Sequence, residues 1–444
     1  MNRFIALTGL TLLMATPVVN AEVSDAEFEA LKDQLNEALG RIDELEGKAA
    51  ETEAAVQKNT ATVEENSAGV EEIQSVSGSS WADRIKIVGD FRYRYQNEDR
   101  SDRDKDRNRQ RIRARPAIIA QVTDSTEVGF GLTTGGEDPV SANQTLGGGG
   151  SSKDINLDLA YVTWVPEYGA GAFLTAGKFA NPLVAPAKSG LMWDSDWRPE
   201  GFNLGWKNDM FFAQYFGTWL ESDDSGGGGS EYSWGVNGGI DSAFGPLRVK
   251  AGASYYEFNL AGESCAVSSD NEDFDCFDNT FSEVITTIPN PVPPPATIDL
   301  VTDKLFVYDY ELINAFAEVG FDVGSLPLSV WADWVQNQDA PSGKDTGYQA
   351  GAQIGKAKKR GTWQFKAYYE DLESDAVVGQ LTNSDFGGGG TDGKGYFVSA
   401  KYATSDYTNI AIGYYDVEKQ DTENNGLNPF DWKTLQLDFN FKYK

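Results

Sequence analysis

Positively charged side chains recur at every second residue in two early segments of the chain. Arg92 and Arg94 lie in the first segment, and Arg111, Arg113 and Arg115 lie in the second. In a strand this spacing places the guanidinium groups on one face. If these strands form part of the wall of a water-filled channel, the arginines could take a direct part in the passage of ions. They could also pair with nearby aspartates and make the wall rigid, and the two roles are compatible. The same class includes Arg248 and Lys250, with Lys178 and Lys366 as further candidates.

Carboxylates of the opposite charge occur in the segment 181–199 and just beyond it, at Asp194, Asp196 and Glu200. The segment is too apolar to extend into water, so we expect it to fold inward and narrow a pore. Acid on this loop and base on the wall would create a field across the passage, to which Glu137 and Asp138 could add. The arginines favour anions and the acids favour cations, so the sequence does not decide which ions the pore prefers.

The composition excludes several other kinds of chemistry. The 444 residues contain no histidine, which removes Ser-His-Asp and Cys-His catalysis and His-ligated zinc. Lys and Arg number 37 against 68 Asp and Glu, a net charge of −31, so a nucleic-acid partner is not expected. We predict no enzyme activity, no catalytic residue, no metal and no cofactor.

The first residues predict export from the cytoplasm. Arg3 precedes a short apolar stretch, and Val19-Asn20-Ala21 is typical of a cleavage site, so residues 1–21 are interpreted as a signal peptide. In an oxidising compartment the only two cysteines, Cys265 and Cys276, are expected to form a disulfide.

A seven-residue repeat follows the signal peptide. It predicts a coiled coil over residues 22–75, with 76–80 as a linker, and a rod of about 70 Å. Such a seam needs partner chains, so we expect an oligomer. One seam position holds Phe28, Leu35, Ile42, Ala49, Val56, Val63 and Val70, and the other holds Leu31, Ala38, Leu45, Thr52, Asn59, Asn66 and Ile73.

From Ile85 onward apolar and polar residues alternate, as in strands with lipid on one side and water on the other. Seven tight turns are expected near residues 124, 166, 208, 245, 325, 358 and 405. Eight long connections alternate strictly with them, at 97–108, 135–153, 181–199, 220–231, 260–303, 337–345, 372–393 and 419–431. The sequence therefore predicts an all-β transmembrane antiparallel barrel of 16 strands over residues 81–444.

Two further features belong to the strand ends and the loops. Aromatic residues near the strand ends predict interfacial girdles; they include Trp164, Trp219, Trp331, Trp334 and Trp363. Four-glycine tracts at 147–150, 226–229 and 387–390 are interpreted as flexible loop tips.

At several segments the chain resembles a family of bacterial outer-membrane porins with an N-terminal coiled coil. The matching stretches are WADRIKIVGDFRYRY at 81–95, RQRIRAR at 109–115, EDPVSANQTLG at 137–147, LDLAYV at 157–162, GKFANP at 177–182 and WDSDWRPEG at 193–201. The resemblance implies passive diffusion of ions and small solutes, as a homotrimer. Tyr443 is followed by Lys444, whereas such proteins usually end on an aromatic residue.

The function expected from these features is a water-filled porin in the outer membrane of a Gram-negative bacterium, with the coiled coil in the periplasm and lipopolysaccharide around the barrel. One alternative is a channel selective for a sugar or an oxyanion; Trp193 and Trp197 could then serve as a sugar slide, or simply pack the loop to the wall. The other is an envelope tether that reaches peptidoglycan or a periplasmic partner through the coiled coil.

Overall fold

The chain divides into two compact units, Met1–Ser80 and Trp81–Lys444. The computed structural model describes part of residues 29–60 in the first unit. In the second unit it describes residues 81–136, 138–222, 231–265, 275–289, 297–420 and 429–443. The signal peptide at 1–21, the linker at 76–80, Glu137 and the glycine tract at 226–229 lie outside the described residues.

The described part of the first unit is helical, including residues 43–48, 51–53 and 56–58. Leu45 and Val56, two of the seam residues, expose 65% and 57% of their surface in the single chain. Lys48 pairs with Glu44 one turn earlier, at 2.6 Å. Among the described residues, no helix combines the length and the apolar character needed to cross a bilayer.

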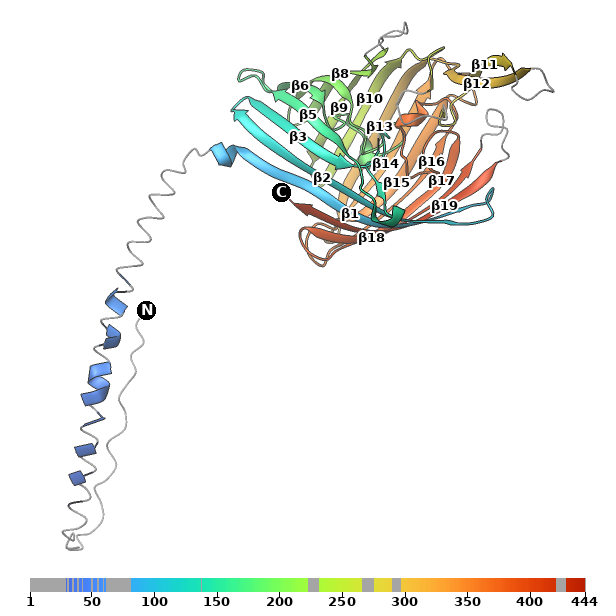
Figure 1. Cartoon of the computed structure of the whole chain (residues 1–444). Helices are drawn as coiled ribbons and strands as arrows, with labels where there is room; N and C mark the ends of the chain where they lie inside the picture. The colour runs from blue at the N-terminus through green and yellow to red at the C-terminus, as the bar shows by residue number, and fades with distance from the viewer. Residues whose placement is uncertain are drawn as a thin grey trace. The chain divides into compact units, whose positions relative to one another are not determined.

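The second unit is a closed antiparallel barrel (Figure 1). Its sheet has 17 strands, of which β4 has only two residues, so sixteen strands form the wall, as predicted. Closure is direct, because β1 pairs with both β2 and β19. The strands are β1 (Ile85–Arg100), β2 (Arg107–Thr123), β3 (Thr126–Thr134), β4 (Gln144–Thr145), β5 (Ile155–Trp164), β6 (Ala172–Lys178), β7 (Glu200–Lys207), β8 (Phe211–Glu221), β9 (Glu231–Phe244), β10 (Leu247–Phe258), β13 (Tyr310–Val323), β14 (Leu326–Asn337), β15 (Thr346–Gly355), β16 (Trp363–Leu372), β17 (Gly393–Ala403), β18 (Thr408–Lys419) and β19 (Phe430–Tyr443).

Short elements occur outside the wall. A separate hairpin, β11 (Phe281–Pro289) and β12 (Thr297–Phe306), lies within the long connection after β10. The single-turn 3-10 helices are η1 (Trp81–Arg84), η2 (Gly148–Gly150), η3 (Pro186–Lys188) and η4 (Gly379–Leu381).

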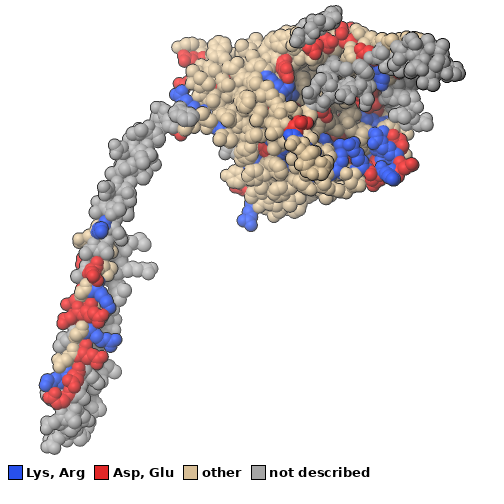
Figure 2. Space-filling view, viewed as in Figure 1, with Lys and Arg blue, Asp and Glu red and all other residues tan. Residues whose placement is uncertain are grey.

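Side chains alternate between the two faces of the wall as the sequence predicts. In β1, Phe91 and Tyr93 are exposed on the outside, whereas Arg92 and Arg94, which alternate with them, are buried on the inside. In β19, Leu437 and Phe439 also face outward. On the face of the wall seen in Figure 2, most of the surface is tan and few charged side chains are visible. An apolar exterior and a polar interior are the arrangement of a barrel in a bilayer.

The predicted order of turns and loops is confirmed, but two long connections differ in extent. The connection after β10 runs from 259 to 309 rather than from 260 to 303. All seven tight turns fall where expected, for instance at 245–246 between β9 and β10. The first long connection is shorter than predicted, because β1 and β2 remain paired as far as Glu98 and Arg107. The connections between strands β6 and β7 and between β16 and β17 lie at 179–199 and 373–392, close to their predicted ranges.

One member of the predicted aromatic girdles is placed wrongly. Trp331 lies inside the barrel, 5% exposed, with its indole nitrogen donating to Gln349 at 3.1 Å. Trp334 and Trp363 are exposed on the outside. Trp331 and Trp334 are three residues apart in one strand, so alternation places them on opposite faces.

Candidate functional site

Arginines of β1 and β2 form the charged part of the inner wall. Arg94 binds two carboxylates, Asp438 of β19 at 2.7 Å and Asp385 of the 373–392 loop at 2.9 Å. Arg92 donates to the amide oxygen of Asn143. Arg111 contacts Gln96 at 3.3 Å. The five predicted arginines therefore do lie on one inner surface, partly in ion pairs.

The strongest link between wall and loop involves Asp196. Its carboxylate accepts hydrogen bonds from Arg113 at 2.9 Å and from Arg115 at 2.8 Å. Both arginines also bind Asp90 of β1, at 2.9 Å each. Two guanidinium groups thus join two carboxylates, which fixes the loop to β1 and β2 with charge-assisted bonds.

The loop 181–199 runs around the inside of the barrel. The amide of Val184 donates to Asn237 of β9 at 3.3 Å, and the amide of Ala187 donates to Glu318 of β13 at 2.8 Å. Lys366 of β16 donates to the carbonyl of Ala187 at 3.1 Å. Because all of these wall side chains face inward, the loop lies in the lumen.

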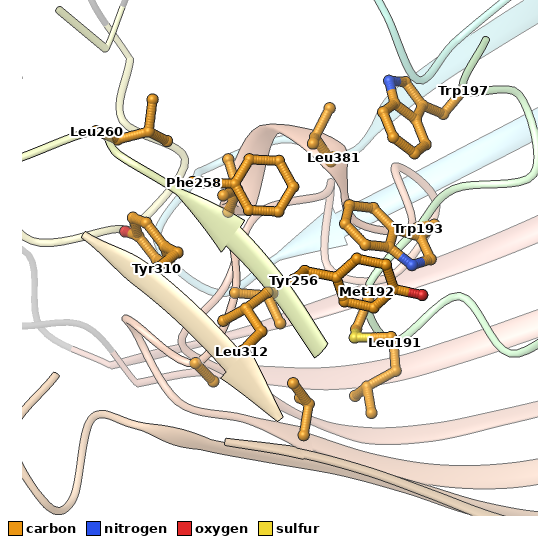
Figure 3. Close-up of a cluster of buried hydrophobic side chains, with 14 of the residues drawn as sticks. Leu191, Met192, Trp193, Trp197, Tyr256, Phe258, Leu260, Tyr310, Leu312 and Leu381 are labelled. Carbon is orange, nitrogen blue, oxygen red and sulfur yellow. The ribbon is translucent and has the colours of Figure 1, made fainter. Parts of the chain in front are cut away.

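An apolar cluster fastens the middle of the loop to the opposite side of the wall (Figure 3). Leu191, Met192 and Trp193 are buried against Tyr256 and Phe258 of β10, and the cluster extends to Tyr310 and Leu312 of β13. The rings of Trp193 and Trp197 stack at 4.9 Å and are 6% and 4% exposed. Both tryptophans therefore pack the loop to the wall, and neither offers an open ring face for sliding sugars.

A second loop, 373–392, folds into the lumen beside the first. The amide of Asp194 donates to Leu381 at 2.8 Å, and its carboxylate accepts from the amide and the hydroxyl of Ser384, at 2.9 and 3.0 Å. Residues 374–382 are buried, including Ala376, Val377 and Val378.

The third glycine tract, 387–390, lies in this second loop and is packed. The interpretation of this tract as a flexible tip is therefore wrong. Gly388 has a φ of +84°, and a Cβ there would overlap the indole ring of Trp432. Gly390, at +79°, lies against the carbonyl of Phe277. Glycine occurs at these positions because a side chain has no room and the backbone is left-handed.

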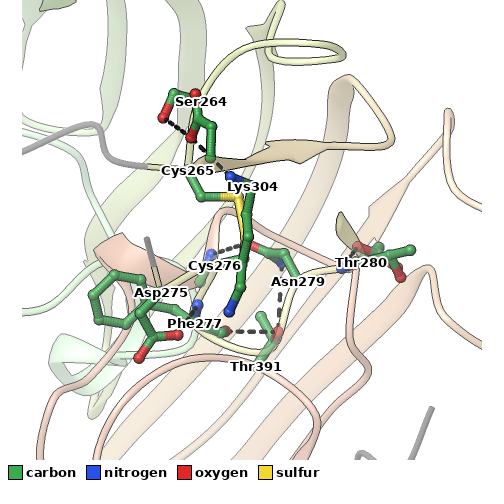
Figure 4. Close-up of a disulfide and its surroundings, with 12 residues drawn as sticks. Ser264, Cys265, Asp275, Cys276, Phe277, Asn279, Thr280, Lys304 and Thr391 are labelled. Atoms are coloured by element: carbon green, nitrogen blue, oxygen red, sulfur yellow. Dashed lines mark hydrogen bonds between the residues drawn. A yellow bond between two sulfur atoms is a disulfide. The ribbon is translucent and has the colours of Figure 1, made fainter. Parts of the chain in front are cut away.

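The disulfide region covers one side of the second loop (Figure 4). Cys265 and Cys276 are disulfide-bonded and buried. Asn279 donates to the carbonyls of Ser374 and Val377 at 2.6 and 2.9 Å, and the amide of Thr391 donates to the carbonyl of Phe277 at 3.0 Å. The connection after β10 thus supports the 373–392 loop through buried hydrogen bonds.

Some of the predicted site residues lie apart from the arginine cluster. Arg248 is near the turn end of β10, half exposed, and pairs with Asp322 at 2.8 Å. Lys250 pairs with Glu318 at 3.3 Å. Glu200 begins β7 and pairs with Lys178 at 2.6 Å, with its side chain 63% exposed. Asp138 accepts from the amide of Val140 at 2.9 Å.

The loop acids differ in how their environment affects protonation. Burial, followed by the charge of Asp196, raises the pKa of Asp194 to about 7. Burial alone would also raise the pKa of Asp196, but Arg113 and Arg115 hold it well below its usual range. Arg94 and Arg92 likewise outweigh burial at Asp385 and hold its pKa at about 2. At neutral pH, Asp196 and Asp385 are therefore fully charged.

A cavity of about 370 Å³ lies between the two loops and the wall of β5–β8, lined in part by Asp158, Lys178 and Arg198. In the described part of the chain, no group of three or more His, Cys, Asp or Glu side chains is arranged to hold a metal ion.

A closed barrel with an apolar exterior, a charged interior and inward-folded loops is the architecture of outer-membrane channel proteins. The chain belongs to a family described as "Putative porin", whose model matches residues 97–280 and 297–443. The family and the barrel confirm the predicted porin class and the outer-membrane location.

The barrel fold of OprB resembles that of this chain, and other solved structures match over a similar length with lower TM-scores. OprB of Pseudomonas putida is 11% identical with a TM-score of 0.53, over 82% of this chain and 95% of that chain. OmpF of Salmonella typhi, in complex with daunomycin, is 12% identical with a TM-score of 0.44, over 80% and 97%. In vitro folded OmpT of Vibrio cholerae, in a trimer form, is 11% identical with a TM-score of 0.39, over 81% and 99%. No curated protein matches the chain.

Proposed function

We propose that the protein is a diffusion porin that lets ions and small hydrophilic solutes cross the outer membrane passively. The observation that carries this proposal is the pair of bonds from Asp196 to Arg113 and Arg115, because they hold a loop across the inside of a closed, charged wall. A loop fixed in this way makes the channel narrower, and the charged wall beside the loop still faces water.

In this proposal the predicted site residues have distinct tasks. Arg92, Arg94 and Arg111 give the inner wall its positive charge, while Arg113 and Arg115 also anchor the 181–199 loop. Asp194 and Asp196 belong to the narrow part. Arg248, Lys250 and Glu200 lie nearer the ends of the strands and contribute to the charge of the two mouths. No catalytic role is assigned to any of them.

We further propose that the N-terminal unit is a periplasmic coiled coil and that the porin is a homotrimer surrounded by lipopolysaccharide. The heptad pattern supports this, and so does the exposure of Leu45 and Val56, which leaves apolar seam surface for partner helices. A tether to peptidoglycan or a periplasmic partner through this unit is compatible with the channel. Deleting residues 22–80 would separate the roles, because conductance should survive whereas envelope integrity should fail if tethering matters.

Single-channel recording in a planar bilayer tests the porin function. The refolded, full-length mature protein should give large ohmic conductance steps, grouped in threes for a trimer. Heat-modifiable migration in gel electrophoresis would show beforehand that the barrel is folded. A folded and inserted protein that conducts nothing would contradict the proposal and favour the tether.

A further inference from the structure

Several cations on the inner surface have no carboxylate partner within salt-bridge distance among the described residues. Arg111 and Lys366 bind only neutral groups, and four other cations share one region of the lumen. They are Arg92 of β1, Lys401 of β17, Lys442 of β19 and Lys188 of the 181–199 loop. Strands β17, β18, β19 and β1 are consecutive neighbours in the wall. Lys401 interacts electrostatically with each of the other three cations. The four therefore form one cluster between the loop and this part of the wall.

The nearby carboxylates are already bound by other arginines. Asp90 and Asp196 are bound by Arg113 and Arg115, and Asp438 and Asp385 are bound by Arg94. These three arginines and four carboxylates together carry one negative charge. The four cations of the cluster outweigh it and leave a net of three positive charges in this region of the lumen.

Arg92 gives a second and independent indication of a ligand. It is 9% exposed, its Nε atom has no hydrogen-bond acceptor, and its described hydrogen bond goes to the neutral amide of Asn143. A buried guanidinium is normally satisfied by acceptors, preferably charged ones. The guanidinium of Arg92 therefore has a donor left for an anionic hydrogen-bond acceptor, and the neighbouring lysines could bind the same anion.

The backbone of the loop places the fourth cation at this site. Ala187 and Lys188 both adopt left-handed conformations, with φ of 46° and 56°, which are unfavourable for residues other than glycine. Glu318 and Lys366 hold the backbone of Ala187 from two strands. The side chain of Lys188 is exposed, and it interacts electrostatically with Lys366, Lys401 and Lys442.

We propose that Arg92, Lys188, Lys401 and Lys442 form a binding site for small oxyanions with two or more negative charges, and that this site makes the channel anion-selective. This inference rests on the proposed porin function and names its solute class. Three ammonium groups and one guanidinium offer donors from several directions, which suits a phosphate-like ion or a small dicarboxylate better than a neutral sugar. Sugar recognition is not supported, because Trp193 and Trp197 are buried.

The test is the reversal potential of the full-length protein in a planar bilayer under a KCl gradient. The wild type should prefer chloride over potassium. Adding phosphate or succinate should reduce the chloride current at concentrations that leave neutral glucose without effect, and comparison of the two anions distinguishes inorganic from carboxylate solutes. The double variant Lys401→Gln/Lys442→Gln should lower the anion-to-cation permeability ratio by about fourfold. This is the change expected when two charges act with opposite sign on the anion and the cation, through water over about 8 Å, and are screened by salt over a similar length.

Arg248→Gln is the matched control, because it also removes an inner-face cation but lies outside the cluster and is paired with Asp322. It should change the permeability ratio much less than either Lys401→Gln or Lys442→Gln alone. Arg92→Gln should weaken the block by phosphate. A wild-type channel that conducts but prefers potassium, or equal effects in the lysine and control variants, would overturn the anion site while leaving the porin function intact. Complete absence of conductance would instead contradict the porin function itself.

Discussion

Replacing Asp196 by asparagine should loosen the 181–199 loop without unfolding the barrel. Asp196 accepts bonds from Arg113 and Arg115, and its side chain is 7% exposed. A hydrogen bond to a charged group contributes about 1.5–3 kcal/mol, so the two together amount to about 3–6 kcal/mol. Asparagine keeps one neutral acceptor, and both arginines keep Asp90 as a partner. We therefore expect the free energy of loop docking to fall by about 2–4 kcal/mol.

Such a loss raises the ratio of open to docked loop by about 30- to 1000-fold. The apolar cluster around Trp193 continues to hold the loop for most of the time. Single-channel traces of Asp196→Asn should therefore show brief steps of higher conductance above the wild-type level. The reversal potential should also move toward anions, because the change removes a negative charge and leaves two guanidinium groups with fewer partners.

Glu200→Gln is the control for this prediction, because it removes the same charge from an exposed pair with Lys178. Exposed ion pairs contribute little, about 0–1 kcal/mol. If the traces and reversal potentials of Asp196→Asn and Glu200→Gln were the same, the bonds to the arginine wall would not be what holds the loop, and the reasoning would be refuted.

Three further predictions concern the two inward loops and the disulfide. Burial and the charge of Asp196 raise the pKa of Asp194 to about 7. Docking of the 181–199 loop is therefore strongest below the ordinary carboxyl pKa and weakens as the pH rises through about 7. Current fluctuations should be fewer at pH 5 than at pH 8, and Asp194→Asn should abolish this difference. Gly388→Ala places a Cβ against Trp432 in a left-handed backbone, so it should displace the 373–392 loop and raise conductance, whereas Gly149→Ala in the exposed first tract should not. Cys265→Ser/Cys276→Ser removes the disulfide that closes a loop of about a dozen residues, and we expect a loss of about 3 kcal/mol in local stability. Limited proteolysis should then cut the connection between β10 and β13 faster than in the wild type. Equal cutting rates would contradict this expectation.

The barrel was predictable because the bilayer imposes a simple rule on each strand. Phe439 and Phe441 had to alternate with Asp438 and Asn440, since one face meets lipid and the other meets water. The strict sequence of short and long connections then fixed the number of strands. The same rule, applied consistently, would have placed Trp331 inside, because Trp334 three residues later faces outward.

The second inward loop was not predictable in the same way. Its glycine tract and polar residues are typical of a mobile surface loop, and its burial depends on residues distant in sequence, such as Phe277 and Trp432. Two signals were nevertheless present. The loop contains the apolar run Ala376-Val377-Val378, and β10 places large side chains on both faces at Tyr255 and Tyr256. A strand whose inner face is apolar needs something to cover it.

The pairing of the arginines could not be decided from the sequence either. Alternation places Arg92 and Arg94 on the same inner face, yet Arg94 binds two carboxylates and Arg92 binds a neutral amide. The difference arises from Asp385, which is almost three hundred residues away and reaches Arg94 only because its loop folds inward. Both roles considered for these arginines are therefore compatible with the structure, since some are bound by carboxylates and one is not.

The order of residues within the 181–199 loop determines which side of the lumen stays charged. Leu191 to Trp193 contact the apolar wall of β10 and β13, and Asp196 contacts the arginines of β2. Reversed docking would bury the Asp196 carboxylate against Tyr256 and Phe258, which costs several kcal/mol for an unpaired charge. The loop therefore has one favourable orientation. In that orientation Asp196 binds Arg113 and Arg115, Asp194 binds Ser384, and neither acid is within salt-bridge distance of Lys401 or Lys442. We therefore expect the wall from β17 to β1 to keep an excess of positive charge.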